Sequence, residues 1–191
     1  VSVVDGTDAI GSVNFSIAQS GADFYLARLD GYYYCPIGMS FLYTQPRRQE
    51  GVSTLTVSYF HGSGYSKEWT YTGLIDMTAW VSVAQALQFQ KYLCSGYRDY
   101  LSHVANEGHR ILCTSWQVDP ILPLPIVGGV FAVRLPGTMG TGHADALHLQ
   151  AVLAREGVHV GVIPLPVRNG PDILAARVTV AVYNDIGDVK R

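Results

Sequence analysis

Two apolar segments joined by one loop constrain the fold of this chain more than any other feature. The stretch GADFYLARLDGYYYCPIGMSFLYTQ predicts one strand over Asp23–Leu29 and a second over Met39–Thr44. Short runs rich in apolar and aromatic residues are typical of buried strands, and Pro36 and Gly38 mark the turn between them. The chain is therefore expected to fold around a sheet.

The rest of the chain alternates between strand and helix patterns, which indicates an α/β fold. A short apolar strand at Ser2–Val4 ends in the polar turn Asp5–Asp8, and ligands of open α/β sheets bind at such carboxyl ends. Asp76 is a good N-cap for a following helix. Further helices are predicted at residues 15–20, 80–87 and 95–116, and residues 45–67 are predicted to form a long loop, with a strand at residues 53–59 as an alternative.

The composition changes after the proline-rich piece Asp119–Pro125, and a smaller α+β unit is predicted beyond it. Its elements are strands at residues 130–135, 158–163 and 174–183 and a helix at residues 144–156. We therefore expect two domains, residues 1–119 and residues 120–191. Because the chain begins with Val1 inside a predicted strand, we also expect the natural polypeptide to have a preceding segment.

Charge and hydropathy exclude several classes of partner. Only 15% of the residues are charged and the net charge is −2, so neither a nucleic acid nor an anionic membrane surface is expected. No run of about 18 apolar residues is present, which excludes a membrane-spanning helix. A hydrophobic share of 48% favours a subunit interface or an apolar ligand cleft. The three cysteines lack metal-ligand spacing and predict a reduced, cytoplasmic location.

Arg177 is the one cation in the last predicted strand. Alternation along that strand places it opposite the valine face, where a planar guanidinium could hold a carboxylate in a bidentate pair. The alternative is an edge-strand arginine on a solvated face. No GxSxG, P-loop, HExxH or Rossmann glycine motif is present, and no metal site is predicted.

Three segments together resemble the class V aminotransferase family of pyridoxal-phosphate (PLP) enzymes. They read VVDGTDAIGSVNFSIAQSGADFYLARLDGYYYCPIGMSFLY, EWTYTGLIDMTAW and ARVTVAVYND. The chain is most similar to the branch of isopenicillin N epimerases and cysteine-desulfurising lyases. The resemblance implies the second half of a fold-type-I large domain, with a mostly parallel sheet and helices, followed by the small C-terminal domain. It also implies a homodimer, or a partner chain that supplies the missing N-terminal half.

The resemblance implies a role for each matching position. Asp5 stands where the family's aspartate pairs with the pyridinium nitrogen of PLP, whereas Asp8 replaces the motif's histidine. Counting back from Pro36 aligns the family's Schiff-base lysine with Gly31 and the histidine before it with Asp30. Glycine can neither form the Schiff base nor move the α-proton. The resemblance therefore predicts a degenerate site.

Two further positions matter. The family's glycine–threonine pair, which reaches a cofactor phosphate across the dimer, appears here as Gly73-Leu74. The arginine that holds the substrate carboxylate matches Arg177. The segment that carries the phosphate cup is not in this chain. We therefore expect a site with no cofactor, because Gly31 occupies the lysine position.

The first functional hypothesis is a cofactor-independent isomerase or cyclase of secondary metabolism, with a pericyclic step as one form. It would fold a small apolar or carboxylate-bearing molecule, since orientation alone is worth ~7 kcal/mol or more. The candidate acid–base or catalytic residues are Asp5, Asp8, Asp30 and Tyr32, and the candidate substrate-binding residues are Arg177, Tyr34 and Leu74.

Two alternatives remain open at this point. One is a non-catalytic pseudoenzyme that acts as a partner subunit through the old dimer face. The other is a PLP-dependent epimerase or cysteine lyase that another chain completes with the amine and the phosphate cup.

Overall fold

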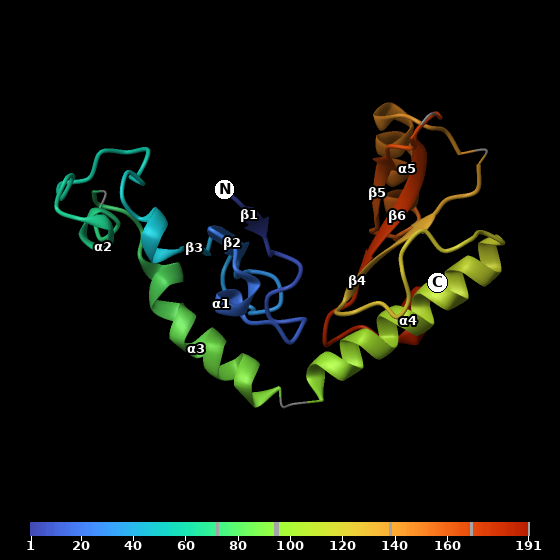
Figure 1. The fold of residues 1–191 in the computed structure, drawn as a ribbon. Coiled ribbons are helices and arrows are strands. Elements are labelled where there is room, and N and C mark those ends of the chain that lie inside the picture. Colours follow the sequence, from blue (N-terminus) through green and yellow to red (C-terminus); the bar gives the residue numbers. More distant parts are fainter. Residues whose placement is uncertain (72, 94–95, 138, 169, 191) are drawn as a thin grey trace. The chain divides into compact units, whose positions relative to one another are not determined.

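The computed structural model divides the chain into two compact units, Val1–Cys94 and Ser95–Arg191 (Figure 1). The structure describes residues 1–71, 73–93, 96–137, 139–168 and 170–190. The division falls before the long helix α4 (Tyr97–Trp116), which packs on strand β4 (Val130–Arg134) of the second unit. The division of domains after residue 119 stays a prediction. We describe each unit by itself, as unit 1 and unit 2.

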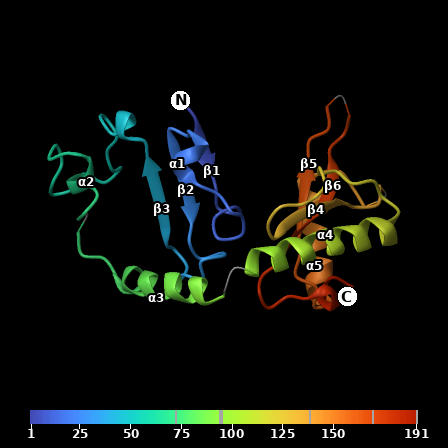
Figure 2. The same ribbon diagram turned by 60° about the horizontal axis from the view of Figure 1, so that its bottom comes forward.

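A three-stranded sheet forms the centre of unit 1 (Figure 2). Its strands are β1 (Val3–Asp5), β2 (Phe24–Arg28) and β3 (Ser40–Thr44), in the order β1-β2-β3. β1 pairs with β2 in parallel, with Asp5 opposite Leu26, whereas β2 and β3 are antiparallel. Because β1 and β2 are parallel, their carboxyl ends meet at one edge of the sheet. The strand–loop–strand prediction is confirmed.

Helices and loops surround this sheet. The helices of unit 1 are α1 (Ile17–Ser20), the 3-10 helix η1 (Pro46–Arg48), α2 (Tyr65–Glu68) and α3 (Thr78–Tyr92). The loop between β2 and β3 packs on α3 through a cluster of buried side chains, namely Cys35, Met39 and Ala86. The strand predicted at residues 53–59 is wrong, because these residues form turns and irregular backbone. Polar and apolar residues alternate here, but no neighbouring strand among the described residues pairs with this segment.

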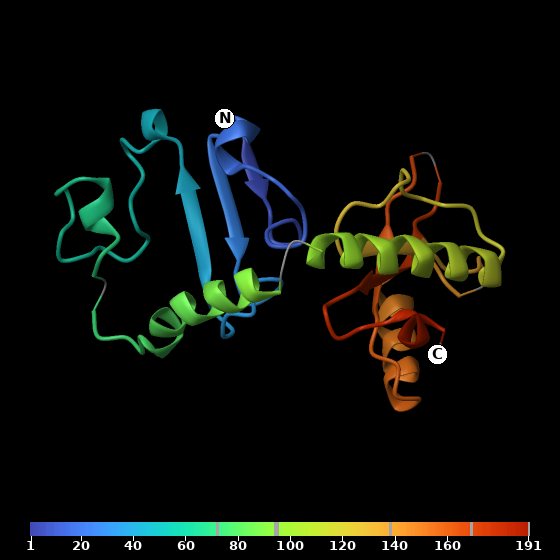
Figure 3. The same ribbon diagram turned by 90° about the horizontal axis from the view of Figure 1, so that it is seen from below.

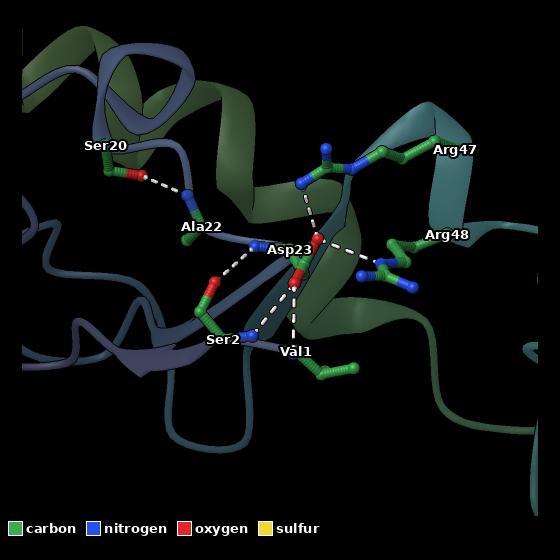
Figure 4. A network of polar contacts seen from close by, with 7 residues as sticks. All are labelled: Val1, Ser2, Ser20, Ala22, Asp23, Arg47 and Arg48. Atoms are coloured by element: carbon green, nitrogen blue, oxygen red, sulfur yellow. Dashed lines mark hydrogen bonds and ion pairs between the residues drawn. The ribbon is translucent and has the colours of Figure 1, made fainter.

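A buried carboxylate ties the start of β2 to its surroundings (Figure 4). Asp23 accepts hydrogen bonds from the backbone N–H of Ser2 at 2.9 Å and from Arg47 Nη2 and Arg48 Nε, each at 2.9 Å. The backbone N–H of Asp23 donates back to Ser2 Oγ at 3.0 Å. The hydrogen bond from Arg48, followed by that from Ser2, holds the pKa of this carboxyl well below its usual value. One side chain thus connects β1, β2 and η1.

Unit 2 is a two-layer arrangement of a sheet and helices (Figure 3). The strands β4, β5 (Gly161–Leu165) and β6 (Ile173–Thr179) are antiparallel and lie in the order β4-β6-β5. Helix α5 (His143–Arg155) packs on β5, and the short helix α6 (Ile186–Val189) contacts α4. The small α+β unit predicted beyond the proline-rich piece is thus present, with α4 added to it.

The core of unit 2 lies between the sheet and the helices. One buried cluster joins a face of the sheet to Ala146 of α5; its other members are Leu135, Val162, Leu174 and Ala176. The α4 side chains Leu101, Val104 and Ala105 are also buried. Their spacing is that of one helix face, which explains why the sequence pattern predicted this helix. Within the parts of the chain that the structure describes, no helix is both long and apolar enough to cross a membrane. The cytoplasmic location stays a prediction.

Candidate functional site

The candidate site lies at the sheet edge where β1 and β2 end. Asp5, the last residue of β1, accepts a hydrogen bond from the backbone N–H of Thr7 at 3.0 Å. The hydroxyl and the backbone of Thr7 lower the pKa of Asp5, and the charge of Arg28 acts in the same direction. Asp5 therefore stays ionised at neutral pH. The turn is also tied to β2, because Thr7 Oγ1 accepts from the backbone N–H of Arg28 at 3.3 Å.

Arg28 and Asp30 form a bidentate ion pair beside Asp5. Arg28 Nε lies 3.0 Å from Asp30 Oδ1, and Arg28 Nη2 lies 3.0 Å from Asp30 Oδ2. The Asp30 side chain is only 6% exposed, whereas that of Arg28 is 65% exposed. Asp30 first, then the charges of Asp8 and Asp5, raise the pKa of Arg28. Of the aspartates predicted at this edge, Asp30 thus pairs directly with Arg28, whereas Asp8 and Asp5 act on this guanidinium through their charge.

The turn after β1 is closed by tight packing on Tyr32. Ser12 Oγ donates to the carbonyl of Asp8 at 2.6 Å. Gly11 has φ +81°, and a Cβ added to it would lie 2.9 Å from Tyr32 Cβ. Tyr32 itself is buried. The predicted residue Tyr32 therefore lies under the turn and supports its backbone, while its role in chemistry stays a prediction.

The two other predicted ligand contacts of unit 1 differ in their surroundings. Tyr34 adopts the left-handed region at φ 57°, and its ring meets Phe89 of α3 edge-to-face at 5.3 Å between centroids. Leu74 is 98% exposed, which is not the burial of a cleft wall within this unit. Tyr34 thus packs against α3, and the ligand-binding roles of Tyr34 and Leu74 stay predictions.

Gly31 is the position that the resemblance aligns with the Schiff-base lysine. Its backbone lies outside the left-handed region, and a Cβ built on it would meet no atom within 4 Å. The residue is exposed. The site edge therefore has room for a side chain here, although the sequence provides none.

Arg177 belongs to unit 2. It lies in β6, the central strand, opposite Ala132 of β4 and Gly161 of β5. The alternative that Arg177 is an edge-strand residue is therefore wrong, because β6 has a hydrogen-bonded neighbour on both sides. Arg177 is half-buried and lies among the residues that line a cavity of about 920 Å³ in unit 2. The binding of a substrate carboxylate by Arg177 stays a prediction.

Two residues of this site were not among the sequence candidates. Thr7 lies inside the polar turn after the first strand, and Arg28 lies in the predicted strand Asp23–Leu29. A charged residue at the carboxyl end of an apolar strand was the signal for Arg28. Among the described residues, no group of three or more metal-ligating side chains could hold a metal ion.

No protein-family model matches the chain. An L-cysteine desulfhydrase of Arabidopsis thaliana is 27% identical over 204 residues, which cover 98% of this chain and 45% of the relative. The chain therefore spans less than half of the length of this relative.

Solved structures extend the similarity to the fold. The apo cysteine desulfurase of Thermococcus onnurineus superposes with a TM-score of 0.68 at 15% identity, over 98% of this chain and 49% of that one. The cystine C-S lyase C-DES, in complex with its product cysteine persulfide, gives 0.67 at 14% identity, over 95% and 48%. The fold is that of part of a fold-type-I PLP enzyme. The predicted fold class is thus confirmed.

The expectation of a cofactor-free site is wrong. The relatives are L-cysteine desulfhydrases, and the solved structures of this fold include a C-DES mutant with glycine covalently linked to its PLP cofactor. These findings point to PLP rather than to no cofactor. They do not support the cofactor-independent isomerase or cyclase, a pseudoenzyme or a role in secondary metabolism.

The residues of unit 1 fit PLP in part. The ionised Asp5 at the carboxyl end of β1 suits a protonated ring nitrogen, because Thr7 and Arg28 keep its negative charge. The strands and turns that form this edge contain no lysine, since the first lysine of the chain is Lys67. The degenerate site stays a prediction.

Proposed function

We propose that this chain is part of a PLP-dependent lyase that cleaves the C–S bond of cysteine or a related amino acid. In this proposal, another chain supplies the amine that holds the cofactor and the segment that binds its phosphate. The similarity to an L-cysteine desulfhydrase over 98% of the chain supports the substrate class. The whole protein is thus proposed to be an assembly in which this chain provides one part of the site.

The observation that carries the proposal is the environment of Asp5. A carboxylate at the carboxyl end of a parallel strand is in the position where α/β sheets bind ligands. Thr7 donates to it, and its lowered pKa keeps it negative over the whole physiological range. When bound, PLP supplies an electron sink whose strength depends on a protonated ring nitrogen. In the proposal, Asp5 holds the proton on that nitrogen.

Arg28 and Asp30 set the charge around this carboxylate. Asp30 is nearly buried and keeps the Arg28 guanidinium in one orientation through two hydrogen bonds. A fixed cation limits the repulsion between Asp5, Asp8 and Asp30, and it places a positive charge near Asp5. In the proposal, the pair positions Asp5 and does not exchange protons.

Arg177 is proposed to bind the substrate carboxylate from unit 2. A planar guanidinium suits a carboxylate because two parallel hydrogen bonds can form. The central position of β6 fixes the backbone of Arg177 from both sides, which supports a precise placement of its side chain.

The cofactor part of the proposal is tested by placing a lysine at residue 31. Gly31→Lys puts an amine where the resemblance expects one, and the backbone accepts a side chain there. Gly137→Lys is the matched control, because Gly137 also has an ordinary φ and open space around its Cβ direction but lies in unit 2. Each protein is incubated with PLP, reduced with borohydride, digested and mapped by mass spectrometry.

We expect PLP to be fixed at residue 31 at least about tenfold more than at residue 137, because only residue 31 follows Asp30, which pairs with Arg28 beside Asp5. Adding Asp5→Asn should reduce this difference. Equal labelling at residues 31 and 137 would contradict a PLP site at this edge.

The substrate part is tested separately with the PLP-loaded Gly31→Lys protein. Sulfide release from L-cysteine is expected to exceed that of free PLP at the same concentration. If PLP is fixed at residue 31 but sulfide stays at the free-PLP level, the C–S lyase assignment fails while the cofactor site stands.

A further inference from the structure

A second cavity lies in unit 2, away from β6. It has a volume of about 460 Å³ and is bounded by α4 on one side and by Pro120 and Leu124 on the other. The loop that carries these two residues is held in place by Asn106 of α4. Asn106 Nδ2 donates to the carbonyl of Ile126, and the N–H of Ile126 donates to Asn106 Oδ1, both at 2.8 Å. The cavity is therefore a fixed feature of unit 2.

A thiol and an imidazole meet at the inner wall of this cavity. Cys113 and His109 are one helical turn apart on α4 and both line the cavity. Cys113 Sγ lies 3.6 Å from His109 Nε2 and 3.9 Å from Nδ1. His109 is only 1% exposed, and its ring edge packs on Phe131 with 5.9 Å between centroids. The sulfur is the only polar contact that the described residues give to the imidazole.

Both groups are neutral in the folded protein. Burial raises the pKa of the Cys113 thiol and lowers the pKa of the His109 imidazole. A protonated thiol is a weak nucleophile, so chemistry at Cys113 requires a base in contact with the thiol, and His109 is in that position. The pair is thus arranged for thiol chemistry that begins when an electrophile enters the cavity.

The rim of the cavity carries two opposite charges. Glu107 and Arg110 line it and form an ion pair, with Arg110 Nε 3.0 Å from Glu107 Oε2. Their side chains are 34% and 66% exposed, so this rim reaches solvent. A zwitterionic amino acid carries an ammonium and a carboxylate that complement these two groups. The rim therefore favours a disulfide built from amino acids over an uncharged one.

We propose that Cys113 is a modification site that exchanges with cystine, with His109 as its base. His109 takes the proton of the thiol, and the Cys113 sulfur attacks one sulfur of cystine. The S–S bond of cystine breaks and a mixed disulfide forms between Cys113 and one half-cystine. The leaving cysteine thiolate takes the proton from His109. One disulfide replaces another, so no outside oxidant is needed. This proposal is independent of the proposed lyase function.

The test uses the full chain with Cys94→Ser, which leaves two thiols to compare. Cys35 is the internal control, because it is also buried but packs against Leu29, Met39 and Ala86 and has no histidine contact among the described residues. The protein is incubated with cystine, quenched with acid and mapped by peptide mass spectrometry over time. We expect the mixed disulfide on Cys113 to form at least about tenfold faster than on Cys35.

Variants test the role of His109 as the base separately from the role of the charged rim. His109→Gln should slow the modification of Cys113 without affecting Cys35. Arg110→Gln should slow the reaction with cystine but not with 2-hydroxyethyl disulfide, whereas Arg134→Gln, an exposed arginine of β4, should change neither. If His109→Gln does not fold, the comparison of Cys113 with Cys35 in the unaltered helix still decides. Equal rates at the two thiols, or reaction only after denaturation, would overturn the proposal.

Discussion

Single side chains decide the local structure of unit 1 in ways that the sequence pattern hides. Asp23 reads as the first residue of a strand, yet it joins three elements through Ser2, Arg47 and Arg48. Gly31 aligns with the family's Schiff-base lysine, yet its φ lies outside the left-handed region and no atom lies within 4 Å of its Cβ direction. The sequence shows both residue types but not their surroundings. The partners of Asp23 lie more than twenty residues away in the chain, and the Cβ direction of Gly31 faces open space.

Asp23→Asn should lower the stability of unit 1, because two arginines would then face a neutral amide. The pKa of Asp23 in the folded state is lowered from 3.8. Its contribution is therefore fully present above the unfolded pKa and is lost as the pH falls through the folded one. Urea midpoints at pH 7 and at pH 3 measure this effect.

The pH sensitivity of the Asp23→Asn protein should be smaller than that of the natural chain. Glu50→Gln is the control, since Glu50 is an exposed carboxylate in the same unit. Equal midpoints for the natural and Asp23→Asn proteins at pH 7 would contradict the role assigned to this network.

Gly11→Ala should destabilise unit 1 by about 1–2 kcal/mol, because alanine is strained in the left-handed region. The added Cβ would also lie 2.9 Å from Tyr32 Cβ. Gly31→Ala is the matched control and should be neutral or slightly stabilising. Thermal unfolding followed by circular dichroism distinguishes the two, and a similar loss in both proteins would count against the packing of Tyr32 under the turn.

Helices and strands form where the sequence pattern predicts them if one face of the element is buried. The α4 pattern predicted a helix, and its buried residues Leu101, Val104 and Ala105 lie at helical spacing. Residues 53–59 alternate in the same way as a strand but have no neighbour, so they do not form one. Alternation is a local property, whereas strand formation needs a pairing partner.

Leu101→Ala should lower the stability of unit 2 by about 2–5 kcal/mol, because this side chain is fully buried and its removal leaves a cavity. Leu147→Ala on α5 is the control, since Leu147 is 52% exposed and lies in the same unit. Chemical denaturation is monitored by the fluorescence of Trp116 in a chain with Trp69→Phe and Trp80→Phe, so that the signal reports on unit 2. A change of less than about 0.5 kcal/mol would show that α4 is not held by its apolar face.

At the scale of the whole molecule, each unit has its own sheet with one central strand. β2 lies between β1 and β3, and β6 lies between β4 and β5. A strand with hydrogen bonds on both sides opens only when its unit unfolds, whereas an edge strand can open locally.

Hydrogen–deuterium exchange of the natural chain should therefore be slowest in β2 within unit 1 and in β6 within unit 2. The amide of Arg177 should be among the protected ones, because β6 pairs on both sides at this position. The edge strands β1 and β5 are the internal references. Faster exchange in β6 than in β5 would contradict the strand order of unit 2.

The fold class and most of the strands and helices could be predicted from the amino-acid sequence. These depend on local hydrophobic periodicity and on motif order, which a single chain carries. Three features became visible in the folded chain alone: Arg28 pairs with Asp30, Arg177 lies in a central strand, and Cys113 meets His109 at a cavity. Charge pairing, strand order and cavities arise between residues that are distant in sequence or face a third element, so local patterns do not specify them.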